Sequence, residues 1–122
     1  MKTVDLKNRT KIFSIAILNL VEKIPSNKIG NTIGNQIVRS GTSVGANYRA
    51  VCRAKSDKDF LNKIVIVEEE ADETLFWLEL LIASNILKSD QLEPLVKECN
   101  ELIAIFTASG RTVRNKINAS KK

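Results

Sequence analysis

The chain has 122 residues, enough for one domain over residues 1–122, and 43% of them are hydrophobic, which suffices for a packed core. It carries 19 basic and 14 acidic residues but no histidine, which removes the commonest general base, the commonest metal ligand and the Ser-His and Cys-His catalytic pairs. Its longest uncharged runs are about ten residues, half of the roughly 20 that span a membrane. No signal peptide is recognisable, so we expect a cytoplasmic protein without membrane contact.

The first half of the chain predicts two helices. The first covers about 8–24 and is stopped by Pro25, because the residue before a proline is disfavoured in the α region. The second covers about 29–54 and has a heptad pattern of apolar residues that also includes Ser40 and Asn47. The apolar positions of the two helices recur at spacings of three and four: Phe13, Ala16, Ile17, Leu20, Val21 and Ile24, then Ile33, Ile37, Val44 and Val51.

The third predicted helix covers about 57–85. Ser56 is placed to cap it, and Asp59 can supply the acidic part of a variant capping box. Its apolar stripe is the most regular in the chain and comprises Phe60, Ile64, Val67, Ala71, Thr74, Leu78 and Leu81.

The fourth predicted helix covers about 90–118. We expect Ser89 and Asp90 to cap it, Pro94 to lie in its first turn, and the basic tail 119–122 to be frayed. Its stripe comprises Leu92, Leu95, Cys99, Leu102, Phe106, Val113 and Ile117. Four helices with short connections predict an all-α, antiparallel up-down-up-down four-helix bundle.

The two cysteines, Cys52 and Cys99, lie within apolar helical patterns and not in a spacing typical of metal sites. We therefore expect two buried, reduced thiols and no disulfide.

The stretch 39–50, RSGTSVGANYRA, is unusual for the middle of a helix because it is rich in weak helix formers. Gly41 and Gly45 are four residues apart, a spacing that places small residues on one side of a helix and permits another backbone to approach. The helical pattern continues beyond them and favours one long, bent or straight helix; the alternative is a break near Gly41.

Polar groups on the second and third helices predict a polar packing layer or a subunit interface. Buried hydroxyls and amides require partners, and carboxylates on an apolar face require a cation or a donor. We expect Arg39, Asn47 and Arg49 to meet Glu70 and Glu73. The full set of packing or interface candidates is Arg39, Ser40, Asn47, Glu70, Glu73 and Trp77.

These residues also carry a family resemblance. Arg39 to Ser43 is an Arg-Ser followed by small residues, Ser56 to Phe60 is a Ser-x-x-Asp-Phe helix start, and Glu70 to Leu78 reads Glu-Ala-x-Glu-Thr-x-x-Trp-Leu. With Asn47, these features resemble the four-helix bundle protein family, also called the 23S ribosomal RNA intervening-sequence proteins.

The resemblance implies a left-handed antiparallel bundle that assembles as a homopentamer. The accessory variability determinant of diversity-generating retroelements resembles the same family, and it binds nucleic acid and a reverse transcriptase. The resemblance therefore implies RNA or DNA as a partner, and a reverse transcriptase as a possible protein partner.

Charge is expected to be polarised along the bundle. The start of the first helix, the end of the second, the start of the third and the end of the fourth should meet at one end, which collects 14 basic and three acidic residues. The remainder keeps five basic and 11 acidic residues. A basic end suits a polyanion. The candidates for nucleic-acid binding are Lys7, Arg9, Lys11, Arg49, Arg53, Lys55, Arg111, Arg114 and Lys116.

Two other interpretations compete with this one. Cations at helix C-termini, among them Arg53, Lys55, Arg111 and Arg114, can simply complement the helix dipole. The chain can also be a protein-binding scaffold that uses the basic end or an acidic face on the third helix, formed by Glu68, Glu69, Asp72 and Glu79.

The sequence predicts neither an enzyme nor a metal or cofactor site. Glu70 and Glu73 resemble half of a di-metal carboxylate site, but such bundles use Glu-x-x-His motifs, and the chain has no histidine. Ser40 and Ser43 have no recognisable base to activate them.

Overall fold

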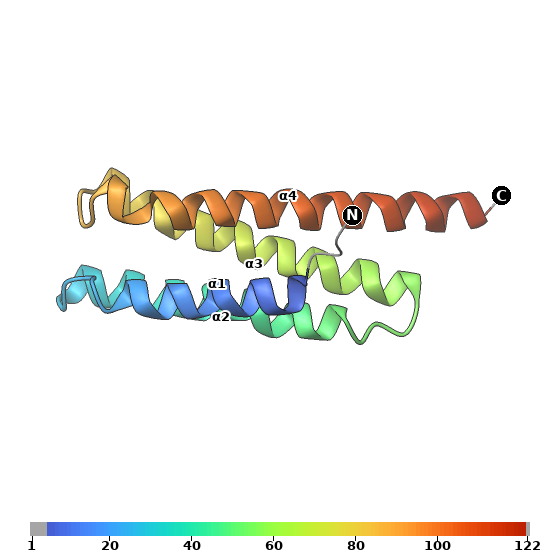
Figure 1. Ribbon diagram of the computed structural model, residues 1–122, viewed down its shortest axis with the longest axis horizontal. Helices are drawn as coiled ribbons and strands as arrows, with labels where there is room; N and C mark the ends of the chain where they lie inside the picture. Colours follow the sequence, from blue (N-terminus) through green and yellow to red (C-terminus); the bar gives the residue numbers. More distant parts are fainter. Residues whose placement is uncertain (1–4, 122) are drawn as a thin grey trace.

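The computed structural model describes residues 5–121 and forms four α-helices within them. They are α1 (Leu6–Val21), α2 (Lys28–Val51), α3 (Asp57–Ala83) and α4 (Ser89–Ser120). Short turns return each helix alongside the preceding one (Figure 1). The predicted all-α four-helix bundle is confirmed, whereas its left-handed sense stays a prediction.

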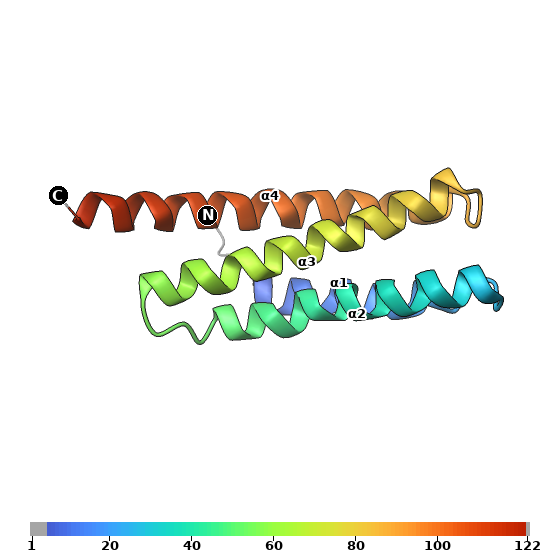
Figure 2. The ribbon, with the colours of Figure 1, turned by 180° about the vertical axis from the view of Figure 1, so that it is seen from behind.

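The packing between helices is uneven. α1 packs mainly on α2, α2 on α3 and α3 on α4, whereas α1 and α4 touch only narrowly. Figures 1 and 2 show α3 between α2 and α4 in both views, with the end of α4 extending beyond the α2–α3 turn. The lengths also differ, since α1 has 16 residues and α4 has 32. None of the helices within residues 5–121 combines the length and apolar character needed to cross a membrane.

The core contains most of the residues that the helical patterns predict, whereas Ala16, Val113 and Ile117 are only partly buried. Its fully buried members include Phe13 and Ile17 from α1 and Ile37 from α2. Residues of α3 and α4 complete it: Ile64, Val67, Ala71, Leu78, Leu81, Leu92, Cys99, Leu102 and Phe106.

The helix ends lie within three residues of the predicted positions. α2 is continuous from Lys28 to Val51, so it has no break at Gly41. The predicted fraying from residue 119 is not observed, because α4 remains helical through Ser120; Lys122 lies outside the described residues.

The expected side-chain cap is present at the start of α3, whereas α4 is capped by a different residue from those expected. The Ser56 hydroxyl accepts a hydrogen bond from the Asp59 N–H at 3.0 Å, and the Asp59 carboxylate accepts one from the Lys55 N–H at 3.0 Å. The assignment of Ser89 and Asp90 as caps is wrong. α4 already begins at Ser89, and the Gln91 side chain accepts a hydrogen bond from the Lys88 N–H at 3.0 Å. For the same reason Pro94 is the sixth residue of α4, in its second turn.

An asparagine in the left-handed region ends α3. Asn85 has φ of 61°, and its N–H donates to the Ile82 carbonyl at 3.1 Å. The next N–H, of Ile86, donates to the Leu81 carbonyl at 3.1 Å. These two bonds form a Schellman motif, which satisfies carbonyls that the helix end would leave unpaired.

The glycines of α2 allow α1 to approach closely. A Cβ atom on Gly41 would lie 2.7 Å from the Ile17 side chain, and one on Gly45 would lie 2.7 Å from the Ser14 hydroxyl and 3.3 Å from the Thr10 carbonyl. The Ser14 hydroxyl donates to the Gly41 carbonyl at 2.8 Å and accepts from the Gly45 N–H at 3.2 Å. The small residues therefore form the contact surface for α1, as their spacing predicted.

Alanine substitutions in α2 should separate this packing role from helix propensity. We expect Gly41→Ala to lower the free energy of unfolding by about 1–2 kcal/mol, since overpacking against Ile17 outweighs the propensity gain. Gly34→Ala is the matched control, because its Cβ would lie 3.7 Å from Val21, an ordinary contact. It should raise stability by about 0.5–1 kcal/mol. Chemical denaturation measures both, and equal effects of the two substitutions would contradict the packing role.

The two thiols differ in environment. Cys99 is buried between α4 and α3 with its Sγ 3.2 Å from the Ala71 carbonyl, and burial raises the pKa of this thiol to about 12. Cys52 is exposed at the end of α2, so the expectation of two buried thiols is wrong for it. Its position one residue beyond the last turn of α2 explains the exposure. Both cysteines are free.

Candidate nucleic-acid interface

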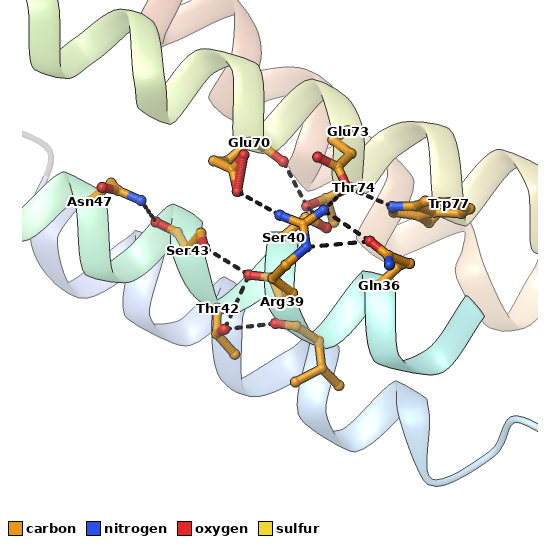
Figure 3. Close-up of polar contacts among 11 residues, drawn as sticks. Gln36, Arg39, Ser40, Thr42, Ser43, Asn47, Glu70, Glu73, Thr74 and Trp77 are labelled. Atoms are coloured by element: carbon orange, nitrogen blue, oxygen red, sulfur yellow. Dashed lines mark hydrogen bonds and ion pairs between the residues drawn. The ribbon is translucent and has the colours of Figure 1, made fainter. Parts of the chain in front are cut away.

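Arg39 of α2 joins two carboxylates of α3, as Figure 3 shows. Its guanidinium lies 3.3 Å from the Glu70 carboxylate and also pairs with Glu73. The Glu73 carboxylate accepts a second hydrogen bond, from the indole N–H of Trp77 at 3.0 Å. The Arg39 side chain is 50% exposed, so this group links the two helices at the surface and not within the core.

A buried hydroxyl pair lies beneath this surface group. Ser40 and Thr74 are both fully buried, and their hydroxyl oxygens are 2.9 Å apart. Thr74 also lies 2.8 Å from the Glu70 carbonyl of its own helix. The sequence predicted Ser40 as a polar residue within the apolar pattern of the second helix, but it did not identify Thr74 as its partner. The signal that could have found Thr74 is its position within the apolar stripe of α3.

Two of the expected partners do not join this layer. The Asn47 amide donates to the Ser43 carbonyl of its own helix at 2.9 Å (Figure 3). Arg49 makes no ion pair within residues 5–121 and lines two hollows whose other charged residues are cations of α1, of α3 and of the α2–α3 turn. The expectation that Asn47 and Arg49 meet the α3 carboxylates is therefore wrong, because both lie one or more turns beyond Arg39 along α2.

A double-mutant cycle should measure the Ser40–Thr74 contact. We expect Thr74→Val to lower the free energy of unfolding by about 1–2 kcal/mol, because it leaves the buried Ser40 hydroxyl without its partner. Ser40→Ala in the Thr74→Val background should then cost less than in the native chain, since no unpaired hydroxyl remains. Additive effects in denaturant titrations would show that the two hydroxyls are not coupled.

The acidic residues at the basic end are already engaged. Asp5 accepts a hydrogen bond from the Asn8 N–H at 3.1 Å, Asp57 lies 3.3 Å from Lys116, and Asp59 lies 2.6 Å from Lys63. Together they balance few of the cations there, so the excess of positive charge persists.

Arg9 does not belong to the free cations. Its guanidinium lies 2.7 Å from Glu98 and 3.0 Å from Glu101, both on α4. The hydrogen bond with Glu98 is the main cause of a raised pKa of the Arg9 guanidinium. The prediction that Arg9 is an unpaired cation of the basic end is therefore wrong. Arg9 joins α1 to α4, because α1 begins opposite Glu98 and Glu101.

Seven of the nine sequence-predicted cations make no ion pair within residues 5–121. They lie in three places. Lys7 and Lys11 stand on α1 beside Arg49 of α2. The others lie at the α2–α3 turn (Arg53 and Lys55) and on the last third of α4 (Arg111 and Arg114).

The helix dipole does not explain the α4 cations. The favourable effect of a cation falls off within the last turn of a helix. α4 ends at Ser120, six residues after Arg114, and its last turn contains no basic residue. The alternative that Arg111 and Arg114 merely complement a helix end is therefore excluded by the length of α4.

Comparison with known proteins identifies the family. The model described as 23S rRNA-intervening sequence protein matches residues 2–108. The chain belongs to the 23S rRNA-intervening sequence protein family. The match includes Lys7, Lys11 and Arg49 but stops before Arg111, Arg114 and Lys116 of α4.

A solved structure resembles this member of the 23S rRNA-intervening sequence protein family closely. It is a crystal structure of a protein from Bacteroides thetaiotaomicron VPI-5482, described as a protein with unknown function from the S23 ribosomal protein family. The two chains are 35% identical, with a TM-score of 0.79, and the similarity covers 85% of this chain and 96% of the other. No curated protein matches the chain.

The carboxylates of this family member do not gather into a metal-binding group. Across residues 5–121, no cluster of three or more cysteine, aspartate or glutamate side chains is placed to hold a metal ion. Glu70 and Glu73, the pair that resembled half of a di-metal site, are both occupied by Arg39.

Proposed function

We propose that this member of the 23S rRNA-intervening sequence protein family is a non-enzymatic, homo-oligomeric protein that binds RNA or DNA through its basic end. Such a protein would act as an accessory to an RNA or retroelement process. The observation that carries the proposal is the set of seven cations without ion pairs in the described residues, gathered where the three local carboxylates are already engaged. Unbalanced cations release condensed counterions when they meet phosphates, which drives association.

The contacts would be to phosphates more than to bases. Tyr48, the only tyrosine, stacks on Phe106 with ring centroids 5.9 Å apart, and Phe60 is half-buried, so neither offers a free face to a base. Recognition through phosphates alone carries little sequence information. We therefore expect binding that tolerates many sequences and weakens steeply with salt.

Salt-dependent retention on immobilised RNA tests the proposal. Arg53→Glu/Lys55→Glu should elute at clearly lower salt than the native chain, because it reverses charge at the basic end. Lys23→Glu/Lys28→Glu is the matched control: it changes the net charge equally, at exposed positions beside the α1–α2 turn. It should elute close to the native chain.

Two results would count against the proposal. If both variants elute alike, net charge and not the basic end governs retention. If the native chain is retained no better than a charge-matched unrelated protein, a protein-binding scaffold becomes the better reading. Its exposed acidic residues on α3, Glu69, Asp72 and Glu79, would then be the first surface to mutate.

We further propose that the chain forms a ring, with five copies as the family resemblance implies. Large exposed apolar side chains are grouped on two helices, Ile12, Ile15 and Leu18 on α1 and Ile66 and Phe76 on α3, and Ile29 stands alone at the start of α2. α1 and α3 do not pack on each other, so these are different faces of the bundle. Contact between two different faces repeats head to tail, and such contacts form a ring when the rotation between neighbouring copies closes.

Light scattering with size-exclusion chromatography tests the assembly. The native chain at micromolar concentration should have five times the mass of one chain, and Ile15→Glu should shift it to smaller species because a buried charge disfavours the interface. Asn100→Glu is the control and should leave the mass unchanged, because it is at an exposed position of α4, whose described residues present no large exposed apolar side chain. A native monomer would refute the ring.

A further inference from the structure

Two shallow hollows on the surface of α2 are bordered by the unpaired cations. The first has a volume of about 420 Å³ and lies between α1 and α2. Lys7 and Lys11 border it on one side and Arg49 on the other, and its floor includes Gly45 and Ala46. The same small residues that let α1 approach α2 thus leave space beneath these cations.

The second hollow continues the first across α2. It has a volume of about 500 Å³ and shares Ala46 and Arg49 with the first. Its other cations are Arg53, Lys55 and Lys63, the last on α3. The two hollows form one surface, the basic track, lined by Lys7, Lys11, Arg49, Arg53, Lys55 and Lys63 over a floor of Gly45, Ala46 and Ala50.

No acidic side chain is among the residues that line the basic track. Lys63 alone of its cations has a carboxylate partner, Asp59 at 2.6 Å, and this hydrogen bond lowers the pKa of the Asp59 carboxyl. Lys7 and Lys11, like Arg49 and Arg53, are like-charged neighbours four residues apart on one helix, an arrangement that destabilises an isolated helix. A bound polyanion would relieve that repulsion.

The hydroxyl groups that line the basic track do not donate hydrogen bonds to a ligand, so its cations would make the contacts. Ser14 donates its proton to the Gly41 carbonyl at 2.8 Å, and Thr42 donates to the Val38 carbonyl at 2.6 Å. Neither has a proton left to donate to a ligand. Contacts would therefore be ionic and aimed at phosphate oxygens, with no aromatic side chain among the lining residues to stack a base.

We propose that the basic track binds the sugar-phosphate backbone of a single-stranded nucleic acid, with consecutive phosphates held first by Lys7, Lys11 and Arg49 and then by Arg53 and Lys55. This inference rests on the proposed function and locates it on one face of α2. A flexible single strand can follow a concave path between the cations of α1 and α3. A duplex, with a persistence length of about 50 nm, resists bending into a path of this size, so we expect it to contact mainly the rim.

Fluorescence anisotropy with labelled 12-nucleotide oligo(U) and oligo(dT), and with a duplex of the same length, tests the track on the full chain. Lys11→Gln/Arg49→Gln should weaken single-strand binding by roughly tenfold or more at fixed salt, and should reduce the slope of log K against log salt by about 1.4, the loss of two phosphate contacts. Two controls carry the same charge loss or half of it: Lys23→Gln/Lys28→Gln, at exposed positions beside the α1–α2 turn and outside the basic end, and Arg9→Gln, whose guanidinium is held by Glu98 and Glu101. Both should bind within about threefold of the native chain. Thermal unfolding checks that each variant is folded.

The outcomes separate this inference from the proposed function. Single strands bound by the native chain but unaffected by the track substitutions would overturn the track and leave the basic end as a general site. Equal weakening by Lys23→Gln/Lys28→Gln would also overturn the track, because net charge would then govern binding. A duplex bound more tightly than the single strands would also overturn it. Failure of the native chain to bind any of these oligonucleotides would overturn both. Comparison of oligo(U) with oligo(dT) then distinguishes RNA from DNA as the preferred strand.

Discussion

The close approach of α1 to α2 is the constraint on which the rest of the structure depends. Gly41 and Gly45 lack the Cβ atoms that would collide with Ile17 and Ser14, and the Ser14 hydroxyl bonds to the backbone of α2 at both glycines. The approach fixes α1 against one side of α2, which leaves the other side to α3. It also brings Lys7 and Lys11 beside Arg49, so a packing requirement determines which cations become neighbours.

The second organising feature is the mismatch in helix length. α1 has 16 residues and α4 has 32, so α1 can cover only part of its neighbour. Where the two helices meet, Arg9 binds Glu98 and Glu101 and is removed from the pool of free cations. Beyond that point α4 still packs on α3, with Gly110 near Leu61 and Ile64, and only its end passes the α2–α3 turn (Figure 2). Arg111 and Arg114 lie outside the reach of the C-terminal dipole of α4.

Polar groups have different roles at different positions along the bundle. Some fix the register of α2 against α3, and others leave positive charge exposed. The Ser40–Thr74 hydroxyl pair is buried, and Arg39 closes over it toward Glu70 and Glu73. All of these groups are satisfied by partners on α2 and α3. About three turns further along α2, Arg49 has no such partner in the described residues, and the helix changes from a packing element to an exposed basic surface.

The sequence by itself determined the fold class, the four helices to within three residues, and most of the core, because apolar periodicity is a local signal that burial enforces. It also identified Arg39 as a partner of the α3 carboxylates and the glycines of α2 as a contact surface. Only the tertiary structure decided that Arg9 is neutralised, that Asn47 bonds within its own helix, that Cys52 is exposed, and that Lys7, Lys11 and Arg49 border one hollow. These facts depend on where one helix stops against another, and that axial offset is set by packing between residues far apart in the chain.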